Sequence, residues 1–162
     1  MLEFSEHNFN QITYNKKTLY MYPIELVTPM SKDLTDFGFE SLSTTEEVDN
    51  ILNKKEGTVL LVVNSVCGCA AANARPAAKL ALHHAAKPDK AVTVFAGVDR
   101  EATERARDYL LPYPPSSPAI ALFKDGNLVH MIERHHIEGR SAQMIAENLI
   151  DAMNTHCVAS AL

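Results

Sequence analysis

Two of the three cysteines in this 162-residue chain, Cys67 and Cys69, are separated only by Gly68. Thiols at this spacing can form a disulfide, bind a soft metal ion, or pack as small buried groups. An apolar run, 58–64, precedes the pair and an alanine-rich stretch follows it. Two cysteines that flank a glycine at such a change in composition favour redox chemistry over a metal site or a purely structural role.

The flanking segments place the first cysteine at the start of a helix. Thr58–Asn64 is apolar and β-branched on both faces, which predicts a buried central strand. Cys69 to about Ala86 predicts a helix that Pro76 should bend. Free N–H groups and the helix dipole at such a position stabilise a thiolate, so the pKa of Cys67 should lie below about 8.5. Cys67 is therefore the candidate nucleophile, and Cys69 its partner.

A disulfide between Cys67 and Cys69 requires a backbone turn that a regular helix does not provide. The bond requires Cα atoms about 4.4–6.8 Å apart, whereas helical residues two apart point to different sides. Gly68 could supply the necessary turn, because glycine accepts unusual dihedral angles. The ring would be small, and a strained disulfide is reduced easily. The pair should then suit oxidation or exchange better than strong reduction.

Composition limits the classes of function. The length predicts one domain with a core that needs no disulfide or metal for folding. A net charge of −5 without a basic stripe argues against a nucleic-acid partner. No apolar run approaches the roughly 18 residues of a membrane span. The first residues lack a secretory pattern, so we expect a reducing, cytoplasmic compartment, where few cysteines indicate redox or metal chemistry.

The remaining segments predict an α/β fold. Pro29 should kink or break the first helix, and Asp125-Gly126 predicts a two-residue hairpin turn. We expect an N-terminal extension at 1–22, the domain at 23–157 and a tail at 158–162. Helices are predicted at 23–36, after capping residues 43–47, at 99–111 and after Ser141, with further strands at 91–98, 119–123 and 128–132.

Two segments, VNSVCGCAAANARPA and SSPAIALFKDG, resemble the bacilliredoxins, a family of thioredoxin-fold proteins. The similarity covers about 29–154, and Pro76 matches the proline that kinks the thioredoxin active-site helix. It implies a thioredoxin-like fold with a central mixed sheet flanked by helices. It also implies an enzyme, a thiol–disulfide oxidoreductase that removes bacillithiol from mixed disulfides on cytoplasmic proteins. Cys67 would take up the small thiol, and Cys69 would be the second active-site cysteine.

Four residues are candidates for substrate binding: Ser117, Pro118, Gly68 and Arg134. The resemblance implies a cis Ser117–Pro118 bond and a docking edge for an extended substrate at that position. Arg134 follows a strand that should return to the cysteine side of the sheet. There it could stabilise the Cys67 thiolate or bind a carboxylate of the small thiol, although a solvated loop without such a role is the simpler interpretation of this segment. The expected partners are bacillithiolated proteins and the small thiol, with no tightly bound cofactor.

Two departures from thioredoxin leave alternatives open. One residue, not two, separates the cysteines, and the strand 58–64 lacks the carboxylate that serves thioredoxin as a proton acceptor. Monothiol exchange is less affected than dithiol reduction. A general disulfide isomerase or oxidoreductase is one alternative. Another is a soft-metal binder that adds Cys157 from the tail or a second chain, although no third ligand lies near Cys67 and Cys69 in the sequence.

Overall fold

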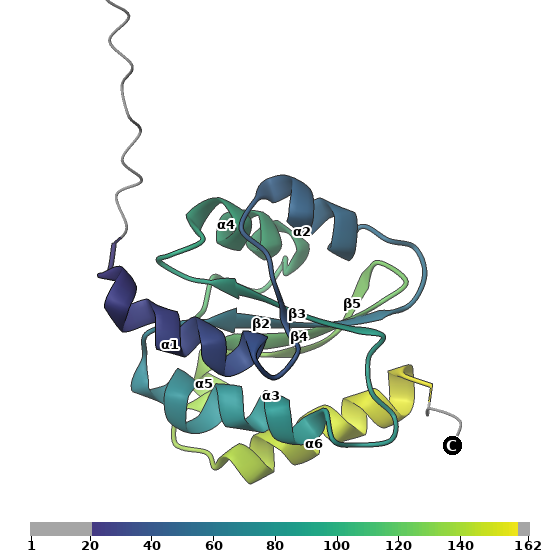
Figure 1. The fold of residues 1–162 in the computed structure, drawn as a ribbon. Helices are drawn as coiled ribbons and strands as arrows, with labels where there is room; N and C mark the ends of the chain where they lie inside the picture. Colours follow the sequence, from purple (N-terminus) through teal and green to yellow (C-terminus); the bar gives the residue numbers. More distant parts are fainter. Residues whose placement is uncertain (1–20, 159–162) are drawn as a thin grey trace, which may run out of the picture.

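The strand before the cysteines forms the centre of a five-stranded sheet (Figure 1). β2 (Thr58–Asn64) is buried at all seven positions, as its apolar character on both faces predicts. It pairs in parallel with β3 (Lys90–Phe95) and antiparallel with β4 (Ala119–Lys124). β1 (Glu40–Ser41) and β5 (Asn127–Ile132) form the edges, so the order is β1-β3-β2-β4-β5. The sheet is therefore mixed, as predicted.

This computed structural model describes residues 21–158. Most of the predicted extension, 1–20, and most of the predicted tail, 159–162, lie outside the described residues. Within residues 21–158, no helix is both long enough and apolar enough to cross a membrane.

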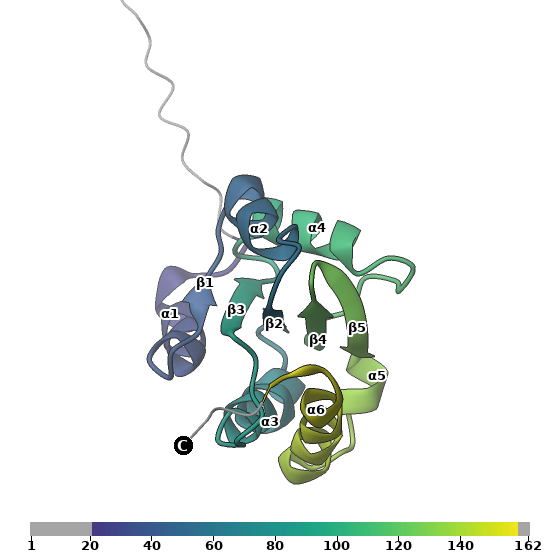
Figure 2. The ribbon, with the colours of Figure 1, turned by 90° about the vertical axis from the view of Figure 1, so that its right-hand side faces the viewer.

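Helices cover both faces of the sheet (Figures 1 and 2). α1 (Ile24–Thr35), α3 (Arg75–Ala81) and α6 (Ala142–His156) share one core with alternate sheet residues such as Leu60 and Val62. On the other face, the core around Leu61 and Val63 contains side chains of two further helices, α2 (Thr45–Leu52) and α4 (Arg100–Tyr109). The central strand thus contributes to both cores, and its C-terminal end, where the cysteines follow, is held from both sides.

The first two helices follow local sequence signals. Of the two effects expected of Pro29, a kink or a break, the break does not occur, because Pro29 lies within α1. The carbonyl group that loses its N–H partner belongs to Glu25, an exposed residue, so water can satisfy it. α2 begins with the predicted Thr44/Glu47 capping box: Thr44 Oγ1 accepts from Glu47 N at 3.2 Å, and Glu47 Oε2 accepts from Thr44 N at 3.2 Å.

The helix after the cysteines is irregular where Pro76 enters it. Ala70–Ala74 form a π-helical turn before α3, and the Arg75 N–H donates to the carbonyl of Ala70, five residues back. This wider turn accommodates the proline ring, which in a regular helix would press on the preceding turn. The helix also ends at Ala81 rather than near Ala86, because turns at 82–86 lead the chain into β3.

The C-terminal end of β3 and two short elements differ from the prediction. β3 ends at Phe95 rather than Val98, because the N–H groups of Val98 and Asp99 both turn back to the carbonyl of Phe95. The hairpin turn is as predicted, with positive φ at Asp125 (51°) and Gly126 (77°). The sequence patterns predicted neither β1 nor the short helix α5 (Arg134–Ile137).

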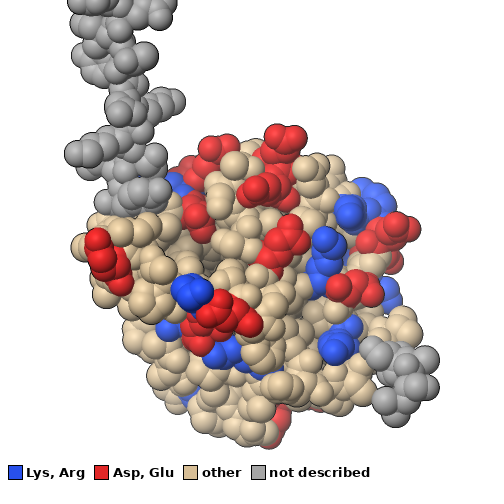
Figure 3. All heavy atoms as spheres, viewed as in Figure 1, with Lys and Arg blue, Asp and Glu red and all other residues tan. Residues whose placement is uncertain are grey.

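Charges of both signs are interspersed on the face shown in Figure 3, and neither sign forms a continuous band there. Several form local pairs, such as Lys32 with Asp36 on α1 at 3.1 Å. Exposed pairs of this kind contribute little to stability.

Candidate active site

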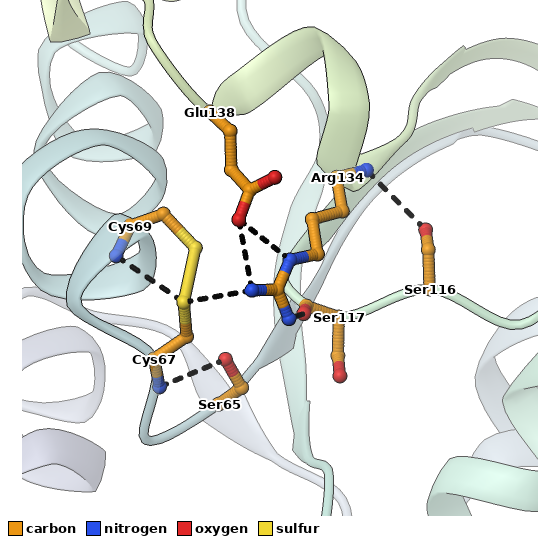
Figure 4. A network of polar contacts seen from close by, with 7 residues as sticks. All are labelled: Ser65, Cys67, Cys69, Ser116, Ser117, Arg134 and Glu138. Carbon is orange, nitrogen blue, oxygen red and sulfur yellow. Dashed lines mark hydrogen bonds and ion pairs between the residues drawn. A yellow bond between two sulfur atoms is a disulfide. The ribbon is translucent and has the colours of Figure 1, made fainter.

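Cys67 caps the helix that the two cysteines begin (Figure 4). Its carbonyl oxygen accepts from Ala70 N at 2.9 Å, and its sulfur accepts from Cys69 N at 3.4 Å. The Cys67 N–H in turn donates to Ser65 Oγ at 3.3 Å. The sulfur therefore occupies the position in which a capping side chain meets the first free N–H groups of a helix. A thiolate at this position would receive a backbone hydrogen bond and the favourable end of the helix dipole.

Cys67 and Cys69 are joined as a disulfide, with Cα atoms 5.3 Å apart. Gly68 does not adopt the positive φ that only glycine tolerates well, so the expected unusual turn is absent. The chain instead turns as it enters the helix, and that turn already brings the two sulfurs together. A Cβ at Gly68 would meet nothing within 4 Å. Gly68 thus lies open to solvent beside the pair, and a role in substrate binding stays a prediction.

Arg134 connects the disulfide to the proline loop (Figure 4). Its guanidinium donates from Nη2 to Cys67 Sγ at 3.4 Å and from Nη1 to the carbonyl of Ser117 at 3.3 Å. Its backbone N–H donates to Ser116 Oγ at 3.4 Å. The side chain is held by Glu138, whose Oε1 accepts from Nε at 2.9 Å and from Nη2 at 2.8 Å. The predicted return of this segment to the cysteine side of the sheet is therefore observed, on a short helix rather than a loop.

The Ser117–Pro118 bond is cis, as the resemblance implied. Pro118 is buried at the start of β4, while Ser117 lies half-buried beside Cys67. A second cis bond, Leu111–Pro112, precedes the same loop and was not predicted. The loop thus brings the Ser117 backbone to the edge of the site.

An open groove of about 450 Å³ runs beside Cys67. Arg134 and Ser117 form one part of its wall, and Tyr22 packs against Gly97 in another. Gly97 has a φ of +85°, and a Cβ there would lie 2.7 Å from the Tyr22 ring, so a larger residue would displace that ring. The complete lining is Met21, Tyr22, Ser65, Val66, Cys67, Ala96, Gly97, Ser117 and Arg134.

Comparisons with known proteins agree with this geometry. The family model described as "Disulphide isomerase" matches residues 22–157. A bacilliredoxin of Cytophaga hutchinsonii is 60% identical, over 80% of this chain and 95% of that protein. One from Halalkalibacterium halodurans is 52% identical, over 84% of this chain and 94% of that protein. The chain belongs to the bacilliredoxin family.

Solved thioredoxins show the fold of this bacilliredoxin family member. Mitochondrial thioredoxin 3 of Saccharomyces cerevisiae, in its oxidised form, aligns with a TM-score of 0.51 at 18% identity, covering 74% of this chain and 97% of that structure. Fasciola hepatica thioredoxin aligns with a TM-score of 0.50 at 19% identity, covering 73% and 99%. Together with the family, this fold identifies a thiol–disulfide oxidoreductase.

A buried polar network lies at the end of β2, directly before the two cysteines of the bacilliredoxin site. Asn64, the last residue of β2, accepts at Oδ1 from Ser65 N at 2.9 Å and from Arg75 Nη1 at 3.1 Å. Its Nδ2 donates to the carbonyl of Met30 at 3.1 Å. Both Asn64 and Arg75 are buried. The network therefore fixes the end of the central strand to the two helices on one side of the sheet, just before the cysteines.

Asp33 neutralises the buried Arg75 guanidinium. Its Oδ2 accepts from Arg75 Nε at 2.8 Å, and its other oxygen pairs with Lys79. Burial alone would raise the pKa of Asp33, but the hydrogen bonds from Lys79 and Arg75 outweigh it, and the pKa is lowered overall. This carboxylate is therefore held ionised where α1 meets α3.

The third cysteine lies at the other end of the sheet. Cys157 is half-buried against the α6 core and lies near Thr58, the first residue of β2, and near Asp89, which precedes β3. Figure 1 shows the end of α6 on the side opposite the arrowhead of β2. Since seven strand residues span roughly 23 Å, Cys157 is too far away to join Cys67 in this arrangement.

Cys157 should react slowly with alkylating agents. Its burial raises the pKa of the thiol. Iodoacetamide applied to the reduced protein at pH 7 should label Cys67 at least about tenfold faster, because the thiolate is the reactive form. Peptide mass mapping over a time course measures both rates. Labelling of Cys157 at the rate of Cys67 would contradict the described packing of the end of α6.

The structure brings together side chains whose proximity the sequence did not indicate. A carboxylate oxygen of Glu138 and the sulfurs of Cys67 and Cys69 all lie within 4.8 Å of one another. A second cluster consists of His135 and His136 on α5 and of Glu133, the N-cap residue of that helix. In the disulfide form, the two sulfurs are bonded to each other and offer no thiolate to a metal ion. The absence of a metal at this site stays a prediction.

Proposed function

We propose that this protein removes bacillithiol from mixed disulfides on cytoplasmic proteins. The observation that carries the proposal is the environment of Cys67 Sγ. It receives the helix N–H of Cys69 and the Arg134 guanidinium, and it borders an open groove. Two donors on one sulfur favour its thiolate, which is the attacking form in disulfide exchange. The bacilliredoxin relatives support bacillithiol as the small thiol that is exchanged.

The chemistry begins with attack on the mixed disulfide. The Cys67 thiolate forms a bond to the bacillithiol sulfur, and the protein thiol of the substrate leaves as a thiolate. Cys67 then carries bacillithiol, which Cys69 or a second small thiol displaces in the next exchange. Each exchange breaks one sulfur–sulfur bond and makes one. The electrons that free the substrate thiol come from the Cys67–Cys69 dithiol, which ends as a disulfide, or from the second small thiol, which ends in a disulfide of two small thiols. The guanidinium of Arg134 also provides a positive charge for a carboxylate of the small thiol.

Substrate docking is proposed at the backbone of Ser117, next to Pro118. Its carbonyl already accepts from Arg134 Nη1 in the oxidised protein. An extended substrate that pairs with this carbonyl must therefore share or displace the guanidinium. Because the Arg134 guanidinium contacts both the Ser117 carbonyl and Cys67 Sγ, substrate docking would change the position of the positive charge beside Cys67.

The test uses the Cys69→Ser variant, because its Cys67 cannot pass the small thiol to a neighbour. The reduced variant is mixed with a carrier protein that bears one bacillithiol, and intact masses are followed over time. We expect the variant to gain one bacillithiol as the carrier loses it. The same carrier bearing glutathione is the matched control, and its transfer should be at least about tenfold slower, because both small thiols carry carboxylates for Arg134 and the groove must then discriminate by shape. Equal transfer of both thiols would contradict the bacillithiol assignment.

The description of the matching family model favours a second candidate, a general disulfide isomerase. An isomerase must release its substrate after rearranging protein disulfides. The measurement is recovery of activity by a scrambled, disulfide-containing ribonuclease. Under the proposed function, this recovery should be slow compared with removal of bacillithiol. Faster isomerisation than bacillithiol removal would favour the second candidate.

A further inference from the structure

Glu138 is the acidic side chain that the fold brings to the two cysteines. It follows α5 and points toward the sulfurs of Cys67 and Cys69, with all three ligand atoms within 4.8 Å of one another (Figure 4). No other Asp or Glu among residues 21–158 joins this group. The side chain is half-exposed, and Nε and Nη2 of Arg134 both donate to its Oε1. The carboxylate is thus held in place and keeps lone pairs for a proton.

The two cysteines differ in what surrounds their sulfurs. Cys67 Sγ receives a backbone N–H and a guanidinium. Within the described part of the chain, no such donor contacts the Cys69 sulfur, and the β2 strand beneath holds no carboxylate. Cys69 therefore begins its attack as a thiol, and a thiol must lose its proton to become the nucleophile. The resolving step requires a nearby proton acceptor, whereas the first attack by Cys67 does not.

We propose that the Glu138 carboxylate accepts the Cys69 proton when Cys69 attacks a mixed disulfide on Cys67. The proton moves from Cys69 Sγ to a carboxylate oxygen, directly or through one water. The sulfur electron pair forms the bond to Cys67 Sγ. The bond from Cys67 to the small thiol breaks, and the small thiol leaves as a thiolate that takes up the proton from Glu138. The proposal rests on disulfide exchange at this site and not on the identity of the small thiol.

Arg134 links the charge on Cys67 to the availability of the Glu138 carboxylate. The same guanidinium that contacts the Cys67 sulfur fixes the Glu138 carboxylate beside the pair. While Cys67 is a thiolate, its negative charge and that of Glu138 share the positive charge of Arg134. Once Cys67 carries the small thiol, that sulfur is neutral, and Glu138 is the negative group left to receive a proton. The acceptor is therefore available at the stage at which Cys69 must act.

The test isolates the resolving step. Reduced protein is loaded on Cys67 by exchange with the symmetric disulfide of either bacillithiol or glutathione at pH 5, where Cys69 stays protonated, and is then jumped to pH 6–9. Release of the small thiol is followed by rapid quench and mass measurement. Glu138→Gln should slow release at least about tenfold at pH 7 with both thiols. The difference should vanish above about pH 8.5, where solvent deprotonates Cys69 without help.

Matched variants separate proton transfer from structure. Glu138→Asp keeps the carboxylate and should recover much of the rate, while Glu147→Gln removes a distant exposed charge on α6 and should change nothing. Alkylation of Cys67 at pH 7 reports whether its thiolate is intact in each variant. An unchanged release rate in Glu138→Gln, or a rate ratio that stays constant with pH, would overturn the proposal. Bacillithiol preference plays no part in this result, so failure of the proposed function would be recognised separately.

Discussion

Cys67→Ser should lose small-thiol transfer completely, with rates at the level of the uncatalysed reaction. Attack on a mixed disulfide requires a thiolate, and serine offers a hydroxyl that stays protonated at neutral pH. The two donors on the Cys67 sulfur, from Cys69 and Arg134, favour that thiolate in the native protein. The measurement is the rate of bacillithiol loss from a labelled carrier protein.

The companion variants assign the roles of the other two cysteines. Cys69→Ser should retain the first transfer and accumulate the small thiol on Cys67, as peptide mapping of the adduct would show. Cys157→Ser should behave like the unmodified protein, since Cys157 lies at the other end of β2. An active Cys67→Ser beside an inactive Cys69→Ser would mean that the nucleophile has been assigned to the wrong cysteine.

Asp33→Ala should cause the largest loss of stability among the predicted variants. It leaves the Arg75 side chain, 7% exposed, without its carboxylate partner. Removal of one member of a buried pair costs about 3–5 kcal/mol, and the lower end applies because Asp33 itself is one-third exposed. Urea unfolding of the oxidised protein measures the change. Asp36→Ala is the matched control on the same helix, and its exposed pair with Lys32 should contribute less than about 1 kcal/mol.

The contribution of Asp33 should depend on pH in a defined direction. Its folded pKa is lowered, so its stabilising effect is complete above the unfolded value of about 3.9 and is lost as the pH falls through the folded value. The difference in unfolding free energy between the native protein and Asp33→Ala should therefore shrink below about pH 4. Replacement of Arg75 by methionine in the same variant should restore part of the loss. Equal effects of Asp33→Ala and Asp36→Ala would contradict a buried pair.

The elements that carry the cysteines could be predicted because local signals and packing agree there. Thr58–Asn64 is apolar at both faces because it is the central strand, and its observed bounds match the prediction. The capping pattern at Thr44 and the hairpin at Asp125 are equally local. Pro76 marked the irregular turn, although the presence of a proline does not by itself specify a π-helical form. The family resemblance added the cis bond before Pro118, which composition alone does not predict.

The rest of the site comes from contacts between segments far apart in the chain. Tyr22 reaches the groove because Gly97 leaves room for its ring, and neither residue carries a signal of that contact. Glu138 was missed because α5 was not predicted. Without a helix there, the spacing of four residues between Arg134 and Glu138 did not indicate that the two side chains pair. The boundary of β3 shifted because a turn, and not a change in hydrophobicity, ends that strand.

The burial of β2 determines how the reactive turn can move. Amides in a central strand that pairs on both sides and is buried on both faces exchange their hydrogens only through near-global unfolding. Cys67 follows this strand by three residues, yet Gly68 is open to solvent. The chain thus passes from its most protected backbone to an exposed turn within one short segment. Cycles of oxidation and reduction can rearrange the turn while the strand that anchors it stays closed.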